Sequence, residues 1–132
     1  MKYLLDTNVC IQFLNQRSER LVSRLRQIRE GEVGLCSIVK AELWYGALKS
    51  GRPGENCSRL RFFFGGLPSV SFDDSAAEAY GNIRSSLEWK GTPIGPNDLC
   101  IAAIALARDL VLVTYNLREF QRNNGLTAEI WE

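Results

Sequence analysis

The chain has 132 residues, of which 45% are hydrophobic and 23% are charged, and its formal net charge is +1. This length predicts one compact domain, residues 1–132, and the near-neutral charge neither favours nor excludes a nucleic acid as a partner. No apolar stretch approaches the ~20 residues that cross a bilayer, and no signal peptide opens the chain, so we expect a cytoplasmic protein without membrane contact. Histidine is absent, which excludes the commonest general acid and base.

The chain begins with a nearly continuous apolar run, Met1–Leu5, which predicts a strand buried on both faces. A helix is expected to start after Asp6-Thr7-Asn8, because all three residues are favourable N-caps. Helical spacing of four apolar residues predicts a second helix, with a C-terminal cap at Gly31. These four residues are Leu21, Val22, Leu25 and Ile28.

Residues Val33–Cys36 form the next strand candidate, and Ser37 can cap a helix that carries Glu42. The segment Ser50–Gly54 breaks that helix, and a further helix then continues to the glycine pair Gly65-Gly66. The two helices together predict a helical hairpin.

A weak strand is expected at Val70–Phe72, and a helix begins at Asp74. The loop Pro93–Pro96 is rigid because two of its four residues are proline. It leads into a helix rich in isoleucine and alanine, with Asp98 in the first turn.

The most strongly apolar strand is predicted at Leu110–Thr114, and a short final strand at Thr127–Trp131. Alternation of strands and helices predicts an α/β fold, a three-layer sandwich with a mainly parallel central sheet, plus the helical hairpin. Ligands bind such sheets beyond the carboxyl ends of the strands. Asp6 and Asn116 both follow directly on predicted strands.

Three acids stand in apolar surroundings: Asp6, Glu42 and Asp98. Burial of a lone carboxylate is costly, so such groups pair, bind metal or become protonated. If they converge, their oxygen atoms suit Mg²⁺ or Mn²⁺, and a metal-activated water could hydrolyse a phosphodiester. The alternative is that Asp6 and Asp98 only cap helices and that Glu42 is a surface acid.

The sequence resembles the PIN domains, and within them the VapC-type ribonuclease toxins of bacterial toxin–antitoxin pairs. The resemblance covers nearly the whole chain and depends on the order of five segments. They are Leu4–Asn8, Ala41–Ala47, Gly91–Asp98, Val113–Phe120 and the terminal Trp131.

The resemblance implies that Asp6, Glu42 and Asp98 are the acids of a metal site. We expect Asp6 and Asp98 to be direct ligands, and Glu42 to be a ligand or to orient a metal-bound water. The resemblance also implies that Thr7 and Thr114 are polar residues lining that site. Many PIN domains carry a fourth acid where this chain has Asn116. Glu119, about one helical turn later, either supplies the missing charge or is a solvent-exposed helix acid.

Candidate RNA contacts are the basic residues nearest to the site in sequence, Arg84, Lys90 and Arg118, although these could instead pair with acids. Five aromatic residues surround the helical hairpin and could form core, a base-stacking platform or a partner groove. They are Trp44, Tyr45, Phe62, Phe63 and Phe64. The resemblance implies an antitoxin segment in such a groove, and a toxin homodimer.

The leading hypothesis is therefore a Mg²⁺-dependent endoribonuclease, the toxin of a toxin–antitoxin pair. Resemblance extends to toxins that cut transfer RNA, including the initiator, in its anticodon region. The alternatives are a metal-dependent DNA nuclease or phosphatase with the same acids, and a non-catalytic module that binds RNA or protein.

Overall fold

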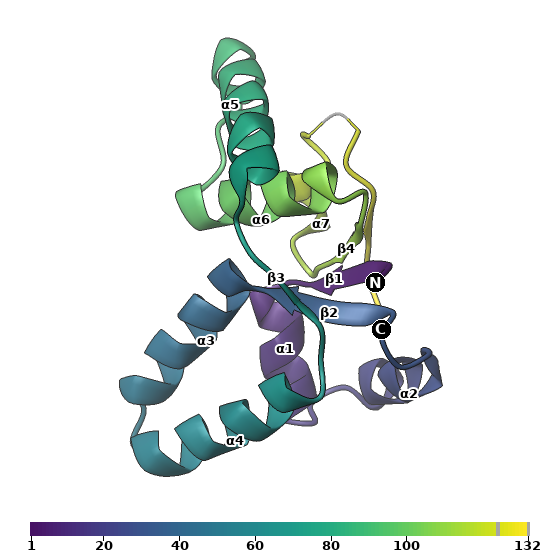
Figure 1. The fold of residues 1–132 in the computed structure, drawn as a ribbon, viewed down its shortest axis with the longest axis vertical. Helices are drawn as coiled ribbons and strands as arrows, with labels where there is room; N and C mark the ends of the chain where they lie inside the picture. Colours follow the sequence, from purple (N-terminus) through teal and green to yellow (C-terminus); the bar gives the residue numbers. More distant parts are fainter. Residues whose placement is uncertain (124, 132) are drawn as a thin grey trace.

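Five parallel strands form the central sheet of the computed structural model, which describes residues 1–123 and 125–131. The strands lie in the order β3-β2-β1-β4-β5 (Figure 1). Their bounds are β1 Tyr3–Leu5, β2 Val33–Cys36, β3 Ser69–Val70, β4 Val111–Val113 and β5 Ala128–Glu129. This arrangement confirms the predicted α/β fold, and within the described ranges every strand pairing is parallel.

Helices cover both faces of the sheet (Figure 1). One layer contains α1–α4 and the other α5–α7, and α5 packs against α6. Their bounds are α1 Thr7–Leu14, α2 Glu19–Gln27, α3 Ser37–Leu48, α4 Pro53–Gly65, α5 Asp74–Trp89, α6 Pro96–Ala107 and α7 Leu117–Phe120. The packed pair α3 and α4 forms the predicted helical hairpin.

The inner strands are apolar at every position because helices cover both of their faces. All residues of β1 and β2 are buried, and Leu4 and Leu35 are fully inaccessible. At Gly34 the backbone of β2 runs so close to its neighbours that a Cβ atom would lie 2.7 Å from the Pro68 carbonyl oxygen. This position therefore requires glycine.

The order of the strands reverses between β1 and β4. From β1 the chain moves outward through β2 to β3, and it then returns to place β4 on the other side of β1. Leu5 is paired with Val113, so the two strands end side by side. A crevice at such a reversal is the usual ligand site of an open α/β sheet.

Several predicted boundaries were wrong by one to a few residues, including the start of α3, where Cys36 and not Ser37 is the N-cap. Helix α1 begins at Thr7, with Asp6 as its N-cap, and not after Asn8. Helix α2 ends at Gln27, and its C-cap is Ile28, whose backbone is extended; Gly31 (φ +88°) lies in the turn that follows. The weaker strands are shorter or shifted, to Ser69–Val70 and Ala128–Glu129, because each pairs with a single neighbour. No helix in the described part of the chain is long and apolar enough to cross a membrane.

Candidate active site at the carboxyl end of the sheet

Asp6 lies at the point where the strand order reverses, directly after β1. It is 4% exposed, and its backbone N–H donates to the Val113 carbonyl oxygen at 2.9 Å. Its Oδ1 accepts a hydrogen bond from the Thr7 N–H at 2.8 Å, which caps α1. Its Oδ2 accepts one from the Thr114 hydroxyl at 2.7 Å. Asp6 is thus a helix cap and also a buried carboxylate in the crevice.

Thr114 holds this carboxylate from the neighbouring strand. It follows β4 directly and is fully buried. While its Oγ1 donates to Asp6, it accepts a hydrogen bond from the Asn116 N–H at 2.9 Å. One hydroxyl therefore fixes both the Asp6 carboxylate and the turn that leads to α7.

Glu42 reaches the same crevice from α3. Its Oε1 accepts a hydrogen bond from the Thr7 hydroxyl at 2.7 Å, and its Oε2 accepts one from Asn97 Nδ2 at 3.4 Å. Thr7 therefore connects Asp6 to Glu42. The sequence reasoning missed Asn97, although its position next to Asp98 on the first turn of α6 is the signal that could have identified it.

Asp98 is the one member of the predicted triad whose carboxylate is free. It is half-buried in the first turn of α6 and makes no hydrogen bond or ion pair within residues 1–123 and 125–131. Burial, followed by the charges of Asp6, Glu119 and Glu42, raises the pKa of Asp98 from 3.8 to about 6. Because the Asp98 carboxylate has no partner among the described residues, it is available to bind a ligand.

Glu119 joins the site from α7 and is not a detached surface acid. Its Oε1 accepts a hydrogen bond from the Gly95 N–H at 3.3 Å, in the loop before α6, and its Oε2 accepts one from the Asn116 amide. Its charge raises the pKa of both Asp6 and Asp98. Asn116 thus positions an acid instead of supplying one.

Four acids from four segments therefore lie close enough together for their charges to interact. Burial raises the pKa of Asp6, hydrogen bonds from Thr114 and Thr7 lower it, and the charges of Glu42 and Glu119 raise it further. Within the described residues, the ion pairs formed by lysine or arginine lie elsewhere, and none includes these acids. The cluster is an excess of negative charge without a cationic side chain as partner.

The chemistry of these oxygen atoms fits a hard divalent cation. In the part of the chain that the structure describes, no three acidic or cysteine side chains form a ready-made metal cage. Mg²⁺ does not require one, because it keeps several waters and takes one or two carboxylates together with phosphate oxygens. Mutual repulsion, the burial of Asp6 and the unpaired Asp98 are the properties expected of carboxylates that hold such an ion.

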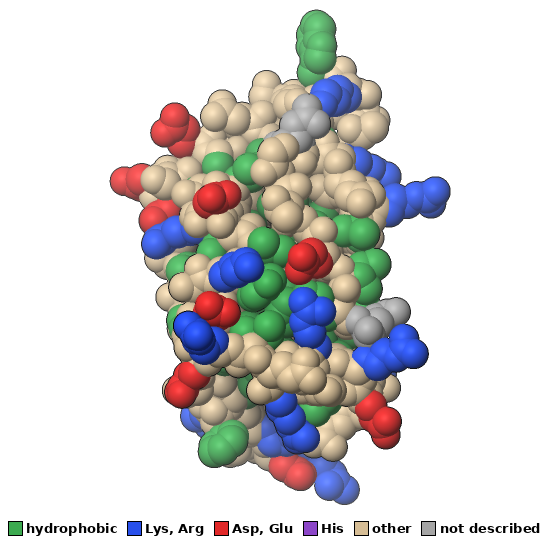
Figure 2. Space-filling view, turned by 90° about the vertical axis from the view of Figure 1, so that its right-hand side faces the viewer, with side chains coloured by type: hydrophobic (Ala, Val, Ile, Leu, Met, Phe, Trp, Pro, Cys, Tyr) green, Lys and Arg blue, Asp and Glu red, His purple; other side chains and the backbone are tan. Residues whose placement is uncertain are grey.

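The three candidate RNA contacts lie apart from this crevice or at its edge. On α5, Arg84 donates to Glu88 at 2.9 Å and to the Tyr80 hydroxyl at 3.1 Å. Lys90 ends the same helix, and Arg118 is exposed on α7 beside Glu119. On the face shown in Figure 2, basic and acidic side chains are interspersed, so no single basic surface marks an RNA site there.

The aromatic set around the hairpin divides into two groups. Trp44, Phe63 and Phe64 are partly buried against the core, which confirms packing as their main role. In contrast, Phe62 is 90% exposed and Tyr45 is 65% exposed.

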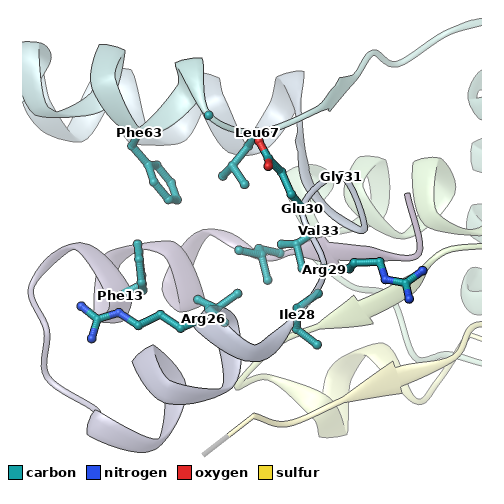
Figure 3. A pocket seen from close by; sticks show the side chains of 12 residues that line it. Phe13, Arg26, Ile28, Arg29, Glu30, Gly31, Val33, Phe63 and Leu67 are labelled. Atoms are coloured by element: carbon teal, nitrogen blue, oxygen red, sulfur yellow. The ribbon is translucent and has the colours of Figure 1, made fainter.

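A groove, here called the α4 groove, runs from Glu42 along α4 through three adjoining cavities of about 250, 630 and 200 Å³. Leu14 and Arg59 line both the first and the second cavity, and Phe13 and Phe63 line both the second and the third. Figure 3 shows Phe13 and Phe63 pointing toward one another across the third cavity. Their ring centroids are 5.6 Å apart.

Comparison with known proteins shows which family the chain is similar to. The model of the PIN domain matches residues 3–126. Among curated proteins, ribonuclease VapC2 of Rickettsia felis is 38% identical over 133 residues, which cover 100% of this chain and 99% of the relative. The tRNA(fMet)-specific endonuclease VapC of Salmonella typhimurium is 40% identical over 131 residues, covering 99% and 98%.

Solved structures agree with these relatives. VapBC2 from Rickettsia felis, bound to a DNA fragment from its promoter, superposes with a TM-score of 0.93 at 38% identity, covering 100% of both chains. DNA-bound VapBC from Salmonella typhimurium gives a TM-score of 0.94 at 40% identity, covering 100% of this chain and 99% of that one. The chain therefore belongs to the PIN domain family and, within it, to the VapC group.

Proposed function

We propose that this protein is a Mg²⁺-dependent endoribonuclease, the toxin of a toxin–antitoxin pair, which hydrolyses phosphodiester bonds of RNA. The observation that carries the proposal is the cluster of four acids at the reversal of strand order, without a cationic partner among the described residues. Relatives named as ribonucleases at about 40% identity support RNA over DNA or a small phosphate ester as the substrate.

In this proposal Asp6 and Asp98 would hold the ion, with Mn²⁺ as a substitute, and Glu42 would be a further ligand or would orient a water. A bound Mg²⁺ would supply charge neutralisation on the phosphate and an activated water as the nucleophile. Thr114 and Thr7 fix the Asp6 carboxylate by two hydrogen bonds and so preorganise it.

The remaining polar residues position the acids. Thr7 and Asn97 hold the two oxygens of Glu42, which orients this carboxylate toward the crevice from α3. Asn116 and the Gly95 N–H hold Glu119 in the same way. A network of this kind reduces the reorganisation needed when charge develops on the substrate.

Transfer RNA is the RNA class that we propose, with the initiator as its most specific candidate, because two relatives are named tRNA(fMet)-specific endonucleases. Expression of the wild type and of Asp6→Asn, followed by sequencing of RNA 5′ ends, tests this assignment. We expect new ends within a transfer RNA for the wild type only. Equal cleavage by a folded Asp6→Asn protein, or a preference for DNA in parallel assays, would reject it.

We also propose an antitoxin that places an apolar segment in the α4 groove and covers the crevice at its Glu42 end. Solved VapBC toxin–antitoxin complexes support such a partner, as does the exposed Phe62 in the wall of the groove. Resemblance to the VapC group further supports a homodimer, which light scattering tests directly. Co-expression of the gene upstream should restore growth if that gene encodes the antitoxin.

A further inference from the structure

A second cavity lies outside the catalytic crevice, between α5, α6 and the segment that follows α7. Its volume is about 350 Å³, at the small end of the range of roughly 300–1,000 Å³ for small-molecule sites. Its apolar wall comes from α5 and α6, and its polar residues are Asn82, Ser86, Arg122 and Asn123. Among the described residues that line it, none is acidic.

Asn123 lines this cavity, and its side chain contains a buried acceptor without a partner among the described residues. Its side chain is 4% exposed, and its Nδ2 donates to the Phe120 carbonyl oxygen at 3.0 Å. Its Oδ1 is buried and has no hydrogen-bond partner in the part of the chain that the structure describes. Because an unsatisfied buried acceptor is costly, a ligand that offers an N–H group would gain from meeting it.

An exposed tryptophan extends the same surface along α5. Asn82, Ser86 and Trp89 follow one another at spacings of four and three residues, which places them on one face of the helix. Trp89 is 91% exposed. Lys90 follows it, and the nearby acid Glu88 is already paired with Arg84.

Two cationic side chains lie beside this cavity and the exposed Trp89. Arg122 is exposed and lines the cavity, and its Nη1 donates to the Pro93 carbonyl oxygen at 3.4 Å. Lys90 stands at the end of α5, beyond Trp89. An aromatic platform, cations and a pocket with amide groups are the combination by which proteins bind unpaired nucleotides.

We infer that this cavity and the adjoining Trp89 form an accessory site for single-stranded RNA of the substrate. One unpaired base enters the cavity, where the polar side chains of Asn82 and Ser86 meet its edge, and a neighbouring base stacks on Trp89. Arg122 and Lys90 contact the phosphates between them. This inference depends on the proposed function, because it assumes that the substrate is RNA.

RNA binding by the full chain tests the site in an Asp6→Asn background, which prevents cleavage. The probe is a fluorescein-labelled anticodon stem-loop of initiator transfer RNA, followed by anisotropy. We expect Trp89→Ala and Arg122→Ala each to weaken binding about tenfold, since loss of one stacked base or one phosphate contact has effects of that order. In the cleaving protein the same changes should raise KM and leave kcat unchanged.

Matched controls lie in the hairpin on the other side of the sheet. Leu48→Ala removes a 64% exposed apolar side chain, and Arg52→Ala removes an exposed arginine. Both should bind the probe as the parent does. The two test positions are exposed, so thermal melting should show intact folding, and 5-bromouridine in the loop should cross-link to α5.

Three outcomes would overturn the inference. Unchanged affinity in Trp89→Ala and Arg122→Ala, while the parent still binds, rejects the accessory site and leaves the proposed function intact. A change in oligomeric mass without a change in RNA affinity identifies this face as a protein interface. If the parent protein binds no RNA at all, the proposed function fails together with the accessory site.

Discussion

Replacing Asp98 by asparagine should stabilise the protein while it abolishes cleavage. The pKa of Asp98 is raised from 3.8 to about 6 by burial and by the charges of Asp6, Glu119 and Glu42. This difference corresponds to about 3 kcal/mol at about 1.4 kcal/mol per pH unit. Because Asp98 is partly exposed, solvent screening reduces the expected gain to about 1–2 kcal/mol.

The gain should depend on pH in a defined direction. Since the folded-state pKa lies above the unfolded-state value, the charged carboxylate destabilises the protein above about pH 6. This cost is relieved as the pH falls from 6 to 3.8, and it vanishes below 3.8, where Asp98 is protonated in both states. The advantage of Asp98→Asn should therefore be full at pH 7.5 and mostly lost near pH 4.

Urea denaturation in the presence of a chelator measures this difference. Glu78→Gln is the control, because it removes one negative charge from an exposed position on α5, away from the acidic cluster. Stability of Asp98→Asn equal to or below that of the wild type at pH 7.5 would refute the electrostatic reasoning. A gain that is the same at pH 4 and pH 7.5 would refute it equally.

Three other substitutions test separate parts of the account. Thr114→Val removes the hydroxyl that donates to Asp6, so we expect a loss of roughly 2–3 kcal/mol in urea denaturation and slower RNA cleavage. Gly34→Ala forces a Cβ atom to 2.7 Å from the Pro68 carbonyl oxygen. The free energy of unfolding should fall by roughly 1–3 kcal/mol, which a lower melting temperature would show. Phe62→Asp puts a charge into the α4 groove, and calorimetry should show antitoxin affinity reduced about tenfold or more, with cleavage unaffected.

The fold was predictable because the strongest local patterns agree with the tertiary structure. Apart from Lys2 and Thr114, the runs at Met1–Leu5 and Leu110–Thr114 are apolar, and only strands covered on both faces need such runs. The weak strands were harder to locate. Ser69–Val70 and Ala128–Glu129 each pair with one neighbour, and their bounds depend on that pairing more than on their own composition.

The acids of the site could be predicted, as could their partners Thr7, Thr114 and Asn116, but the contacts from Asn97 and Gly95 could not. Asp6, Glu42 and Asp98 are conspicuous because each is charged in an apolar segment. The bond from Asn97 to Glu42 spans 55 residues and the bond from Gly95 to Glu119 spans 24. Such contacts follow from how α3, α6 and α7 converge on the sheet, which no local pattern contains.

The accessory cavity was not predictable for the same reason. Its unused acceptor, Asn123 Oδ1, has no hydrogen-bond donor on α5, on α6 or elsewhere among the described residues, and a sequence cannot show this. Arg84, which the sequence reasoning favoured for RNA contact, is instead engaged by Glu88 and Tyr80 on its own helix. Whether a cation is free for phosphate depends on neighbours that only the three-dimensional structure identifies.

The most direct test of the central claim is cleavage of purified initiator transfer RNA across a Mg²⁺ titration, with the wild type and Asp6→Asn compared at equal concentration. We predict that the wild type cuts only when Mg²⁺ or Mn²⁺ is present, and that Asp6→Asn, folded by thermal melting, does not cut at any concentration. Cleavage that persists in excess chelator, or in the folded Asp6→Asn protein, would contradict the assignment of the acidic cluster as a metal-dependent nuclease site.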